Sequence, residues 1–378
     1  MHPTPREKRV TWAELFFDLV FVFAVTELSA LLREDHSWPG VARALVAFVP
    51  VYWGWVGMSV HTNTHDVDNP VDRFGIFAAG LAGLFMALAV PGAYHERGLL
   101  FGASYYALRL VLAALVFRGR QMMLGPFSVP VLVSGPLLVV GGLLDATPRV
   151  LLWGLAALVD LATPTLARRR ISRIRFHAGH LPERFGLFLI IALGESIVSV
   201  GGPAATAAHI DAMELGAVAE SFALACALWW VYFNFAADAI RHSMATTTVQ
   251  NIVIRHVLSY AHLVFVGGII AVAVGLAESV AHPAGLLGTG VAGLLFGGCA
   301  LYLATFGYTR WRMFSHWSTT RLSAAAVVLA LMPVAARLPA LAALGTLLVV
   351  VSALNVVEHL MANASKRSEP EPVAEVDL

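Results

Sequence analysis

Glu27 and Glu195 stand out chemically because each acidic side chain lies inside a long apolar stretch of the sequence. A carboxylate in the hydrocarbon layer of a membrane is costly, and such residues usually face a bundle interior or a wet cavity, where they mark ion or substrate paths. Burial disfavours the charged form of a carboxyl group. A deep carboxyl that titrates near neutral pH is what proton coupling requires. The alternative is that each glutamate stays protonated and holds neighbouring helices together by hydrogen bonds.

The sequences around these two glutamates resemble each other. When residues 14–27 are laid on residues 182–195 without gaps, Phe17 falls on Phe185 and the two glutamates coincide. Matched apolar residues are common in a chain of this composition, whereas matched deep acids are not. The match predicts that the chain is built from two related segments.

The likeness continues in the helix that follows each segment. Laying Trp53 on Trp230 places His61 opposite Asp238. These four residues are candidates for a relay or a cavity lining, although packing is the default role of the two tryptophans. We therefore predict two parallel six-helix repeats, related by an axis along the membrane normal, with the site where they meet.

Further charged residues are expected along the same path. Glu14 and Asp18 are four residues apart and share a helix face, whereas Asp18 and Glu27 point in nearly opposite directions. Arg109 is the only cation expected in the middle of a span, where an unpaired guanidinium would be costly. Its acidic partner is expected to be Asp160 or Glu27. A structural ion pair and a gating or substrate role are both open for Arg109.

Three histidines are candidates for proton transfer or ligand binding. His61 and His65 have the i, i+4 spacing that places both rings on one helix face, which suits a metal ion. This spacing alone is weak support, and we predict no metal. His262 lies deep in an apolar segment, where it is either a relay or a core histidine with its hydrogen bonds satisfied.

The composition identifies an all-α integral membrane protein. Of 378 residues, 58% are hydrophobic and 13% are charged, which excludes an ordinary soluble domain. A helix needs about 20 apolar residues to cross the hydrocarbon core. About twelve such spans are predicted, at residues 11–32, 41–61, 74–92, 98–117, 124–144, 149–167, 184–202, 213–239, 251–277, 285–308, 321–336 and 339–361. The last two are open to a second interpretation, as one broken hairpin.

The distribution of positive charge predicts both the orientation and the division of the chain. With the N-terminus in the cytoplasm, most lysines and arginines fall on the inner side, as the positive-inside rule requires, and both termini are then cytoplasmic. The predicted parts are a first six-helix half at 1–167, a basic linker at 168–183, a second half at 184–362 and a disordered tail at 363–378. The arginines of the linker are interpreted as a topology determinant that touches anionic headgroups, not as a nucleic-acid site.

Several classes of protein are excluded by missing motifs. The sequence has no Walker A, no HExxH and no serine-hydrolase signature, so we predict that it is not an enzyme. Lys8 and Lys366 lie outside the spans, which excludes a retinal Schiff base. Cys226 and Cys299 lie in apolar segments without CxxC spacing, which indicates neither a disulfide framework nor a thiolate metal site. No cofactor is expected.

Two motifs resemble those of the bacterial low temperature requirement protein A family. They are the run from Glu14 to Ala24, and His180, Glu183, Arg184, Phe185, Gly186, Leu187 and Phe188 followed by Leu193, Gly194, Glu195, Ser196 and Ile197. Similarity in length and layout covers nearly the whole chain. The resemblance implies a multi-spanning inner-membrane protein. The family takes its name from a growth phenotype and brings no settled activity.

The first motif is also similar in texture to the Phe-Ser-Asp motif of potassium channels of the transmembrane protein 175 type, which also repeat six helices. The residues concerned are Phe17, Asp18, Phe21, Phe23, Ala24, Thr26 and Leu28. Phe17 replaces the serine, the spacing after Ala24 differs, and the second copy has Gly186 where the aspartate is expected. A cation channel is therefore kept as the alternative.

These observations favour a proton- or cation-coupled secondary transporter in the bacterial inner membrane. Glu27 and Glu195 are the expected coupling carboxylates, and Arg109 is a candidate anchor for an anionic group. The alternatives are a cation channel and a non-transporting membrane sensor or stress-adaptation protein whose buried charges only specify packing. The expected partners are the lipid bilayer and an unidentified small solute or ion, without nucleic acid. A homo-oligomer is left open.

Overall fold

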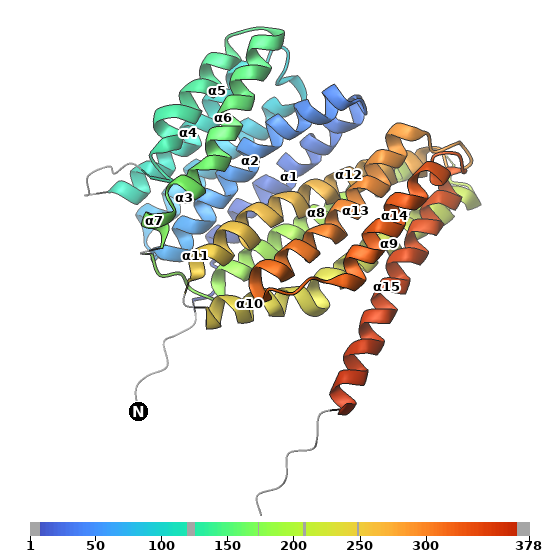
Figure 1. The fold of residues 1–378 in the computed structure, drawn as a ribbon. Helices are drawn as coiled ribbons and strands as arrows, with labels where there is room; N and C mark the ends of the chain where they lie inside the picture. The colour runs from blue at the N-terminus through green and yellow to red at the C-terminus, as the bar shows by residue number, and fades with distance from the viewer. Residues whose placement is uncertain (1–7, 119–124, 173, 207–208, 248, 369–378) are drawn as a thin grey trace, which may run out of the picture.

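The computed structural model describes residues 8–118, 125–172, 174–206, 209–247 and 249–368. These residues form a bundle of long α-helices (Figure 1). Within the described ranges the only β pairing is an isolated bridge between Leu286 and Pro339. The all-α class predicted from composition is confirmed.

The first group of helices begins at the N-terminal side of the chain and runs to the basic linker. Its elements are α1 (Trp12–Glu34), α2 (Trp38–Thr64), α3 (Pro70–Ala89) with the 3-10 turn η1 (Val90–Gly92), α4 (Gly98–Phe117), the π-helical η2 (Pro130–Ser134) leading into α5 (Gly135–Gly142), and α6 (Ala146–Leu166). The short α7 (Arg168–Ile171) follows in the linker.

The second group of helices contains two longer segments that are interrupted by π-helical turns. Its elements are α8 (His180–Thr206), α9 (Ala212–Val231) continued by η3 (Tyr232–Ala236) and α10 (Ala237–Thr246), α11 (Gln250–Val253) continued by η4 (Ile254–Ala261) and α12 (His262–Ala281), α13 (Thr289–Phe314), α14 (Thr319–Ala335) and α15 (Ala340–Ser368).

Each of the twelve predicted spans contains a helix among its described residues, but two of these helices are too short to count as full spans. Among the described residues, 10 helical segments are long and apolar enough to cross a membrane, and the apolar helices Pro130–Gly142 and Thr319–Ala335 are shorter. At 1.5 Å per residue, the first of these is about 20 Å long. The helices α14 and α15 are separate elements joined at residues 336–339, and α14 is shorter than a full span, so the broken-hairpin interpretation stays open. The predicted tail starts within α15, and residues 369–378 lie outside the described residues.

The start of α1 shows how local sequence sets the ends of these helices. Thr11 and Glu14 form a capping box, in which each side chain accepts a hydrogen bond from the backbone N–H of the other. This arrangement satisfies donors that would otherwise be left free at a helix start. It also fixes Glu14 in the first turn of α1, where its carboxylate is buried.

The two groups of helices pack in the same order. In the first group, α1 packs on α2 and α3, α3 on α4, α4 on α5, α5 on α6, and α6 on α2. In the second group, α8 packs on α9 and α12, α12 on α13, α13 on α14, α14 on α15, and α15 on α9. Figure 1 shows the two groups side by side, from blue to green and from light green to red. They meet where α1 and α2 contact α8 and α12, and we call this contact the junction.

The outer surface of the bundle is apolar, as a membrane protein requires. On α3, for example, Phe74, Phe77, Leu81, Phe85 and Leu88 are all exposed. Their spacing of three or four residues places them in one stripe along the helix. The start of α1 and the end of α15 lie on the same side of the bundle (Figure 1).

Candidate functional site

A buried cluster of charged residues joins the two groups of helices at the start of α1. The Arg184 guanidinium on α8 lies between two carboxylates of α1: its Nη1 is 2.5 Å from Glu14 Oε2, and its Nη2 is 2.6 Å from Asp18 Oδ1. Glu14 and Asp18 share a helix face, as their spacing predicted. All three side chains are almost completely shielded from solvent. Ion pairs in such a low-dielectric setting are far stronger than surface pairs. We call this group, with His180, the ion-pair cluster.

Hydrogen bonds fix the protonation state of His180 within the cluster. Asn63 on α2 accepts from the backbone N–H of His177 and donates to its carbonyl, both at 3.1 Å. This orients the amide so that its second N–H points at Nδ1 of His180, 3.2 Å away. Nδ1 must then accept, and Nε2, 3.2 Å from Glu14 Oε2, carries the proton and donates to Glu14. His180 is therefore neutral, and two carboxylates face one guanidinium.

Trp55 completes the cluster from α2. Its indole Nε1 donates to Asp18 Oδ1 at 2.7 Å, and the Arg184 guanidinium lies 5.7 Å from the centre of its ring. Trp55 also stacks on Phe188 of α8, with ring centroids 4.1 Å apart. Among the described residues, Asp18 Oδ2 has no hydrogen-bond partner although it is buried. The cluster itself thus holds two carboxylates, one guanidinium and one free acceptor, and the Lys8 ammonium acts on Glu14 from outside it.

Glu195 lies at the same junction, further along α1 and α8. Its carboxylate accepts hydrogen bonds from Thr26 Oγ1 of α1, at 2.5 Å from Oε2, and from Ser199 Oγ of its own helix. The Glu195 side chain is buried. Thirteen residues separate Glu14 from Glu27 on α1, which corresponds to about 20 Å along the helix axis. The junction therefore has two acidic levels, the ion-pair cluster and Glu195.

Glu27 follows Thr26 directly and is half-buried. The charges of Arg97 and Glu195 act on its carboxylate electrostatically. No hydrogen bond or ion pair joins Glu27 to another residue within the described part of the chain. The structure thus brings the two matched glutamates close enough to interact, with Glu195 fixed and Glu27 unbonded.

Arg109 and Asp160 form a second buried pair, but it lies inside the first group of helices. Arg109 Nη2 is 3.8 Å from Asp160 Oδ2, and Ser134 donates to Asp160 Oδ1 at 2.6 Å. Tyr105 donates to the other carboxylate oxygen and lies beneath the guanidinium. Of the two acidic partners expected for Arg109, the structure selects Asp160. The structure does not bring Arg109 to the junction.

The histidines differ in how well their ring nitrogens are satisfied. His262 is fully bonded, because Nδ1 lies 2.8 Å from the Val257 carbonyl and Nε2 lies 2.8 Å from the Tyr232 hydroxyl. The rings of His61 and His65 stack at 4.6 Å. His61 Nε2 is 3.9 Å from Asp72 Oδ1, and neither of its ring nitrogens has a hydrogen bond in the described structure. Across the described ranges, no group of three or more His, Cys, Asp or Glu side chains is arranged to hold a metal ion.

The remaining predicted residues are divided between the core and the surface. Trp53 is buried and stacks on Tyr260 with a centroid distance of 5.8 Å. Trp230 is 44% exposed on the outer face of α9. Asp238 is exposed as well, and its only ion pair in the described residues is a 3.8 Å contact with Arg241. Trp230 and Asp238 are thus not brought to the junction, because the helix that carries them turns this face outward.

Sequence reasoning missed His180, Arg184, Asn63 and Thr26 as site residues. Arg184 counted only as a positive charge near the inner side of the membrane. A usable signal was present: His180 and Arg184 have the same i, i+4 spacing as Glu14 and Asp18, so two helices each present a pair of complementary groups. Asn63 gave no signal, because its role depends on the backbone of a loop that is distant in sequence.

Comparison with known proteins places this architecture in a family. A family model described as bacterial low temperature requirement A protein (LtrA) matches residues 9–356. The chain belongs to this family. The match contains the whole ion-pair cluster and both glutamates of the junction, so the family resemblance seen in the sequence is confirmed.

One further protein is similar to this chain in sequence. An uncharacterized protein of Rhizobium meliloti (strain 1021) is 30% identical over 312 residues, which cover 79% of this chain and 76% of that protein. No solved structure shows significant similarity to the chain. The geometry of the junction is therefore the main indication of what this family member does.

Proposed function

We propose that this family member is a proton- or cation-coupled secondary transporter of the bacterial inner membrane. The observation that carries the proposal is the buried Glu195 carboxylate, which accepts a hydrogen bond from Thr26 across the junction. A carboxyl group kept in the hydrocarbon layer despite its solvation cost is expected to exchange a proton or a cation. Glu27, which is next to Thr26 and electrostatically linked to Glu195, is the second expected coupling group.

The ion-pair cluster is suited to close one end of this path. Arg184 of the second group holds Glu14 and Asp18 of the first group, so the two groups cannot separate at this end without breaking both ion pairs. Removing one partner of a buried ion pair costs about 3–5 kcal/mol. In this proposal the structure is closed at the cluster, and opening requires a compensating charge.

The second carboxylate of the cluster supplies a reason for coupling. With His180 neutral, a proton or a small cation that reaches Asp18 would neutralise the second carboxylate. Its Oδ2 atom is free to bind it. Protonated Asp18 would hold Arg184 less strongly, because the attraction between unlike charges would be lost. Binding of the coupling ion and opening of the cluster are thus linked in the proposed cycle.

The packing order of the helices supports the proposed duplication. Each of the six principal helix contacts within the first group has a counterpart in the second group. In transporters built from parallel repeats, the binding site lies between the repeats, and the halves rock around it. Glu195 and Thr26 occupy the corresponding position in this chain.

The proposal is tested by proton flux in liposomes that contain the purified protein and an internal pH dye. Pools of amino acids, organic acids and monovalent cations are added outside, and the dye reports proton entry driven by any of them. We expect at least one pool to drive entry, and Glu195→Gln and Glu27→Gln to abolish it. The matched control is Glu220→Gln, because Glu220 is a half-buried acid of α9 that lies near Gly345, away from the junction.

The flux experiment, together with bilayer currents and complementation of a deletion strain, separates the alternatives. A cation channel would give currents in planar bilayers that rise with the electrochemical gradient and do not saturate. Normal flux in both glutamine variants would refute the assignment of the coupling groups. Absence of flux with every pool, together with normal complementation of a deletion strain by both variants, would favour a third class, the membrane sensor or stress-adaptation protein.

That third class is favoured by one specific observation. Arg109 and Asp160 are buried and paired with each other inside the first group of helices, and Ser134 and Tyr105 donate hydrogen bonds to Asp160. Such a pair can specify packing without any ligand. Arg109 is therefore proposed as a structural residue, and not as an anchor for an anionic substrate.

A further inference from the structure

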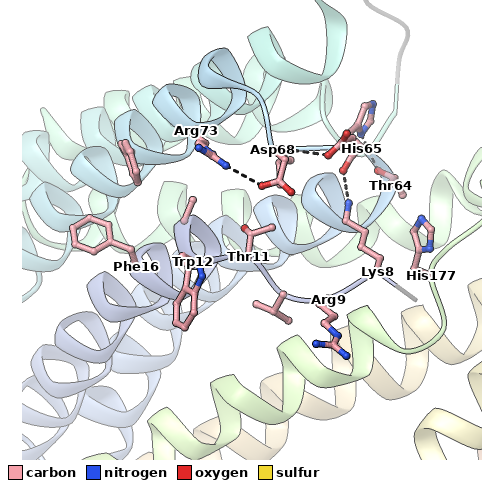
Figure 2. Close-up of a pocket in the computed structure, with 15 residues that line it drawn as sticks. Lys8, Arg9, Thr11, Trp12, Phe16, Thr64, His65, Asp68, Arg73 and His177 are labelled. Atoms are coloured by element: carbon pink, nitrogen blue, oxygen red, sulfur yellow. Dashed lines mark hydrogen bonds and ion pairs between the residues drawn. The ribbon is translucent and has the colours of Figure 1, made fainter. Parts of the chain in front are cut away.

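A large groove opens beside the start of α1, on the same side of the bundle as the ion-pair cluster. Its volume is about 1520 Å³, and it lies between the segment that precedes α1, the loop that joins α2 to α3, and the outer faces of α1 and α3 (Figure 2). The coupling residues Glu27 and Glu195 do not line it. It is therefore a feature separate from the proposed transport site.

The wall of the groove that points toward the membrane is aromatic. Trp12 is 86% exposed, Phe16 is 58% exposed and Phe77 is 43% exposed. Phe16 and Phe77 touch edge to face, with ring centroids 5.7 Å apart, and so join α1 to α3. Tryptophan at the first residue of a membrane helix is typical of the headgroup level, where its ring is apolar and its N–H remains hydrated. This wall suits the upper part of an acyl chain.

The opposite wall is charged, and most of its charges are already engaged. Arg73 Nη2 binds Asp68 Oδ1 at 3.1 Å. Lys8 donates to the carbonyls of Thr62 and His65 at the end of α2. Burial lowers the pKa of the Lys8 ammonium, and the carboxylates of Glu14, Asp66 and Asp68 act in the opposite direction. The ammonium is thus held between backbone and acidic groups.

Arg9 is the cation that remains. It is exposed, and in the described residues no hydrogen bond or ion pair engages it; Figure 2 shows Lys8 and Arg73 with partners and Arg9 without one. Asp66 and Asp68 offset two of the three basic side chains of the groove, which leaves one positive charge. A smaller hollow of about 440 Å³ adjoins Arg9 and is also lined by Glu183 and by Arg241, which is itself paired with Asp238.

We infer that this groove binds a phospholipid whose headgroup carries a net negative charge. The phosphodiester is held at Arg9, and the first part of an acyl chain lies along Trp12, Phe16 and Phe77. One unbalanced positive charge matches one uncompensated phosphate, whereas a zwitterionic headgroup would bring its own cation to a site that is already basic. A basic residue near the membrane surface contributes about fivefold in affinity for anionic lipid.

The test measures which lipids the purified full-length protein retains. The protein in detergent is mixed with equal amounts of phosphatidylglycerol, phosphatidylethanolamine and phosphatidylcholine, passed through a sizing column, and extracted for lipid analysis by mass spectrometry. We expect phosphatidylglycerol to be enriched over both zwitterionic lipids. Arg9→Gln should lower this enrichment about fivefold. Trp12→Ala should lower retention of all three lipids, because it removes acyl contact and not charge.

Arg118→Gln is the matched control, because Arg118 is an exposed arginine at the end of α4 that lines neither hollow. The enrichment in this variant should equal that of the unaltered protein. An equal fall in Arg9→Gln and Arg118→Gln would reduce the effect to general surface charge and overturn the inference. Enrichment of phosphatidylethanolamine, or enrichment that survives Arg9→Gln, would overturn it as well. Inorganic phosphate added in excess should not displace the lipid, since the aromatic wall contributes nothing to a free ion.

Discussion

At the scale of single residues, Arg184 connects the two groups of helices through charge. It is a buried guanidinium with a carboxylate on each side, and both carboxylates belong to the other group. Its Nε atom has no hydrogen bond in the described structure, so the two ion pairs and the indole of Trp55 account for its stability. A change at this position therefore tests the junction directly.

We expect Arg184→Gln to lower the free energy of unfolding by about 3–5 kcal/mol, because Glu14 and Asp18 would be left buried without a cation. Unfolding by denaturant in detergent micelles, followed by circular dichroism, measures this loss. Arg241→Gln is the control, since Arg241 and its partner Asp238 are exposed and such pairs contribute below about 1 kcal/mol. Equal losses in the two variants would show that the cluster does not stabilise the fold.

Asp18→Asn should be much milder than Arg184→Gln. With His180 neutral, the substitution leaves one carboxylate facing one guanidinium, and the amide oxygen can still accept from Trp55. We expect a loss below about 2 kcal/mol, in the range of a perturbed buried hydrogen bond. The same denaturant titration measures it. A loss as large as that of Arg184→Gln would mean that His180 is protonated and that both carboxylates are needed for charge balance.

The sequence could predict one side of the site but not the other. Buried acids are conspicuous in an apolar helix, so Glu14, Asp18, Glu27 and Glu195 were identified. The groups that satisfy them were not, because an arginine near a helix start is equally typical of a topology signal. Which partner Arg109 takes could not be decided either, since both candidate acids lie at mid-span and only packing distinguishes them.

At the scale of elements, the close approach of α2 and α4 depends on a glycine. A Cβ atom at Gly57 would lie 2.7 Å from Arg109 Nη1 and 2.8 Å from Leu112 Cδ2. The end of an arginine is ordinarily able to move, but here Asp160 and the Tyr105 ring hold it in place. The absence of a side chain at Gly57 thus makes room for the buried pair.

Gly57→Ala should therefore destabilise the protein by about 1–3 kcal/mol through overpacking, although alanine favours helix formation over glycine. Gly54→Ala is the matched control one turn away, where the new methyl group would meet Leu108 at an ordinary 3.4 Å. We expect its melting temperature to be unchanged or higher. Thermal unfolding of both variants decides between them, and a stable Gly57→Ala protein would show that Arg109 is free to move.

The helical segments were predictable because hydropathy and length determine them in a membrane. Their ends were less so: α8 begins at His180, one turn before the predicted start, and α15 continues through Ser368 beyond the predicted 361. Both extensions carry polar residues, so hydropathy could not detect them. The π-helical turns η3 and η4 also escaped prediction, since hydropathy and length do not distinguish a π-helical turn from the α-helix around it.

At the scale of the whole molecule, the two groups of helices are held together by few but specific contacts. Besides the ion-pair cluster, these include the Thr26–Glu195 hydrogen bond and Tyr52, whose hydroxyl donates to the Ser259 carbonyl at 2.9 Å. Tyr260 of η4 also donates to the Leu161 carbonyl of α6 at 2.6 Å, and Asn63 bonds the backbone of His177. Each group has its own buried ion pair, Arg109 with Asp160 and Arg321 with Glu358.

If each group of helices folds on its own, the two groups should still assemble with each other when they are expressed as two separate chains. We expect fragments 1–172 and 173–378, expressed together with a tag on one of them, to be purified as a complex. Arg184→Gln should lower the yield of the untagged fragment severalfold, because it removes the charged contact between the groups. Arg321→Gln, which breaks a pair inside the second group, should lower the amount of that fragment in the membrane but not its ratio to the tagged one. A constant ratio in both variants would contradict a junction held by Arg184.

The two short helices have a consequence for how this protein sits in a bilayer. Pro130–Gly142 and Thr319–Ala335 occupy the same fifth place in their groups, and at about 20 Å and 25 Å both fall short of a hydrocarbon layer of roughly 30 Å. Lipids beside them must compress to avoid hydrophobic mismatch, at a cost that grows with every ångström of thickness. A thicker membrane therefore raises the free-energy cost of hydrophobic mismatch at two matching positions of this fold. The length and order of the acyl chains thus influence its conformation directly.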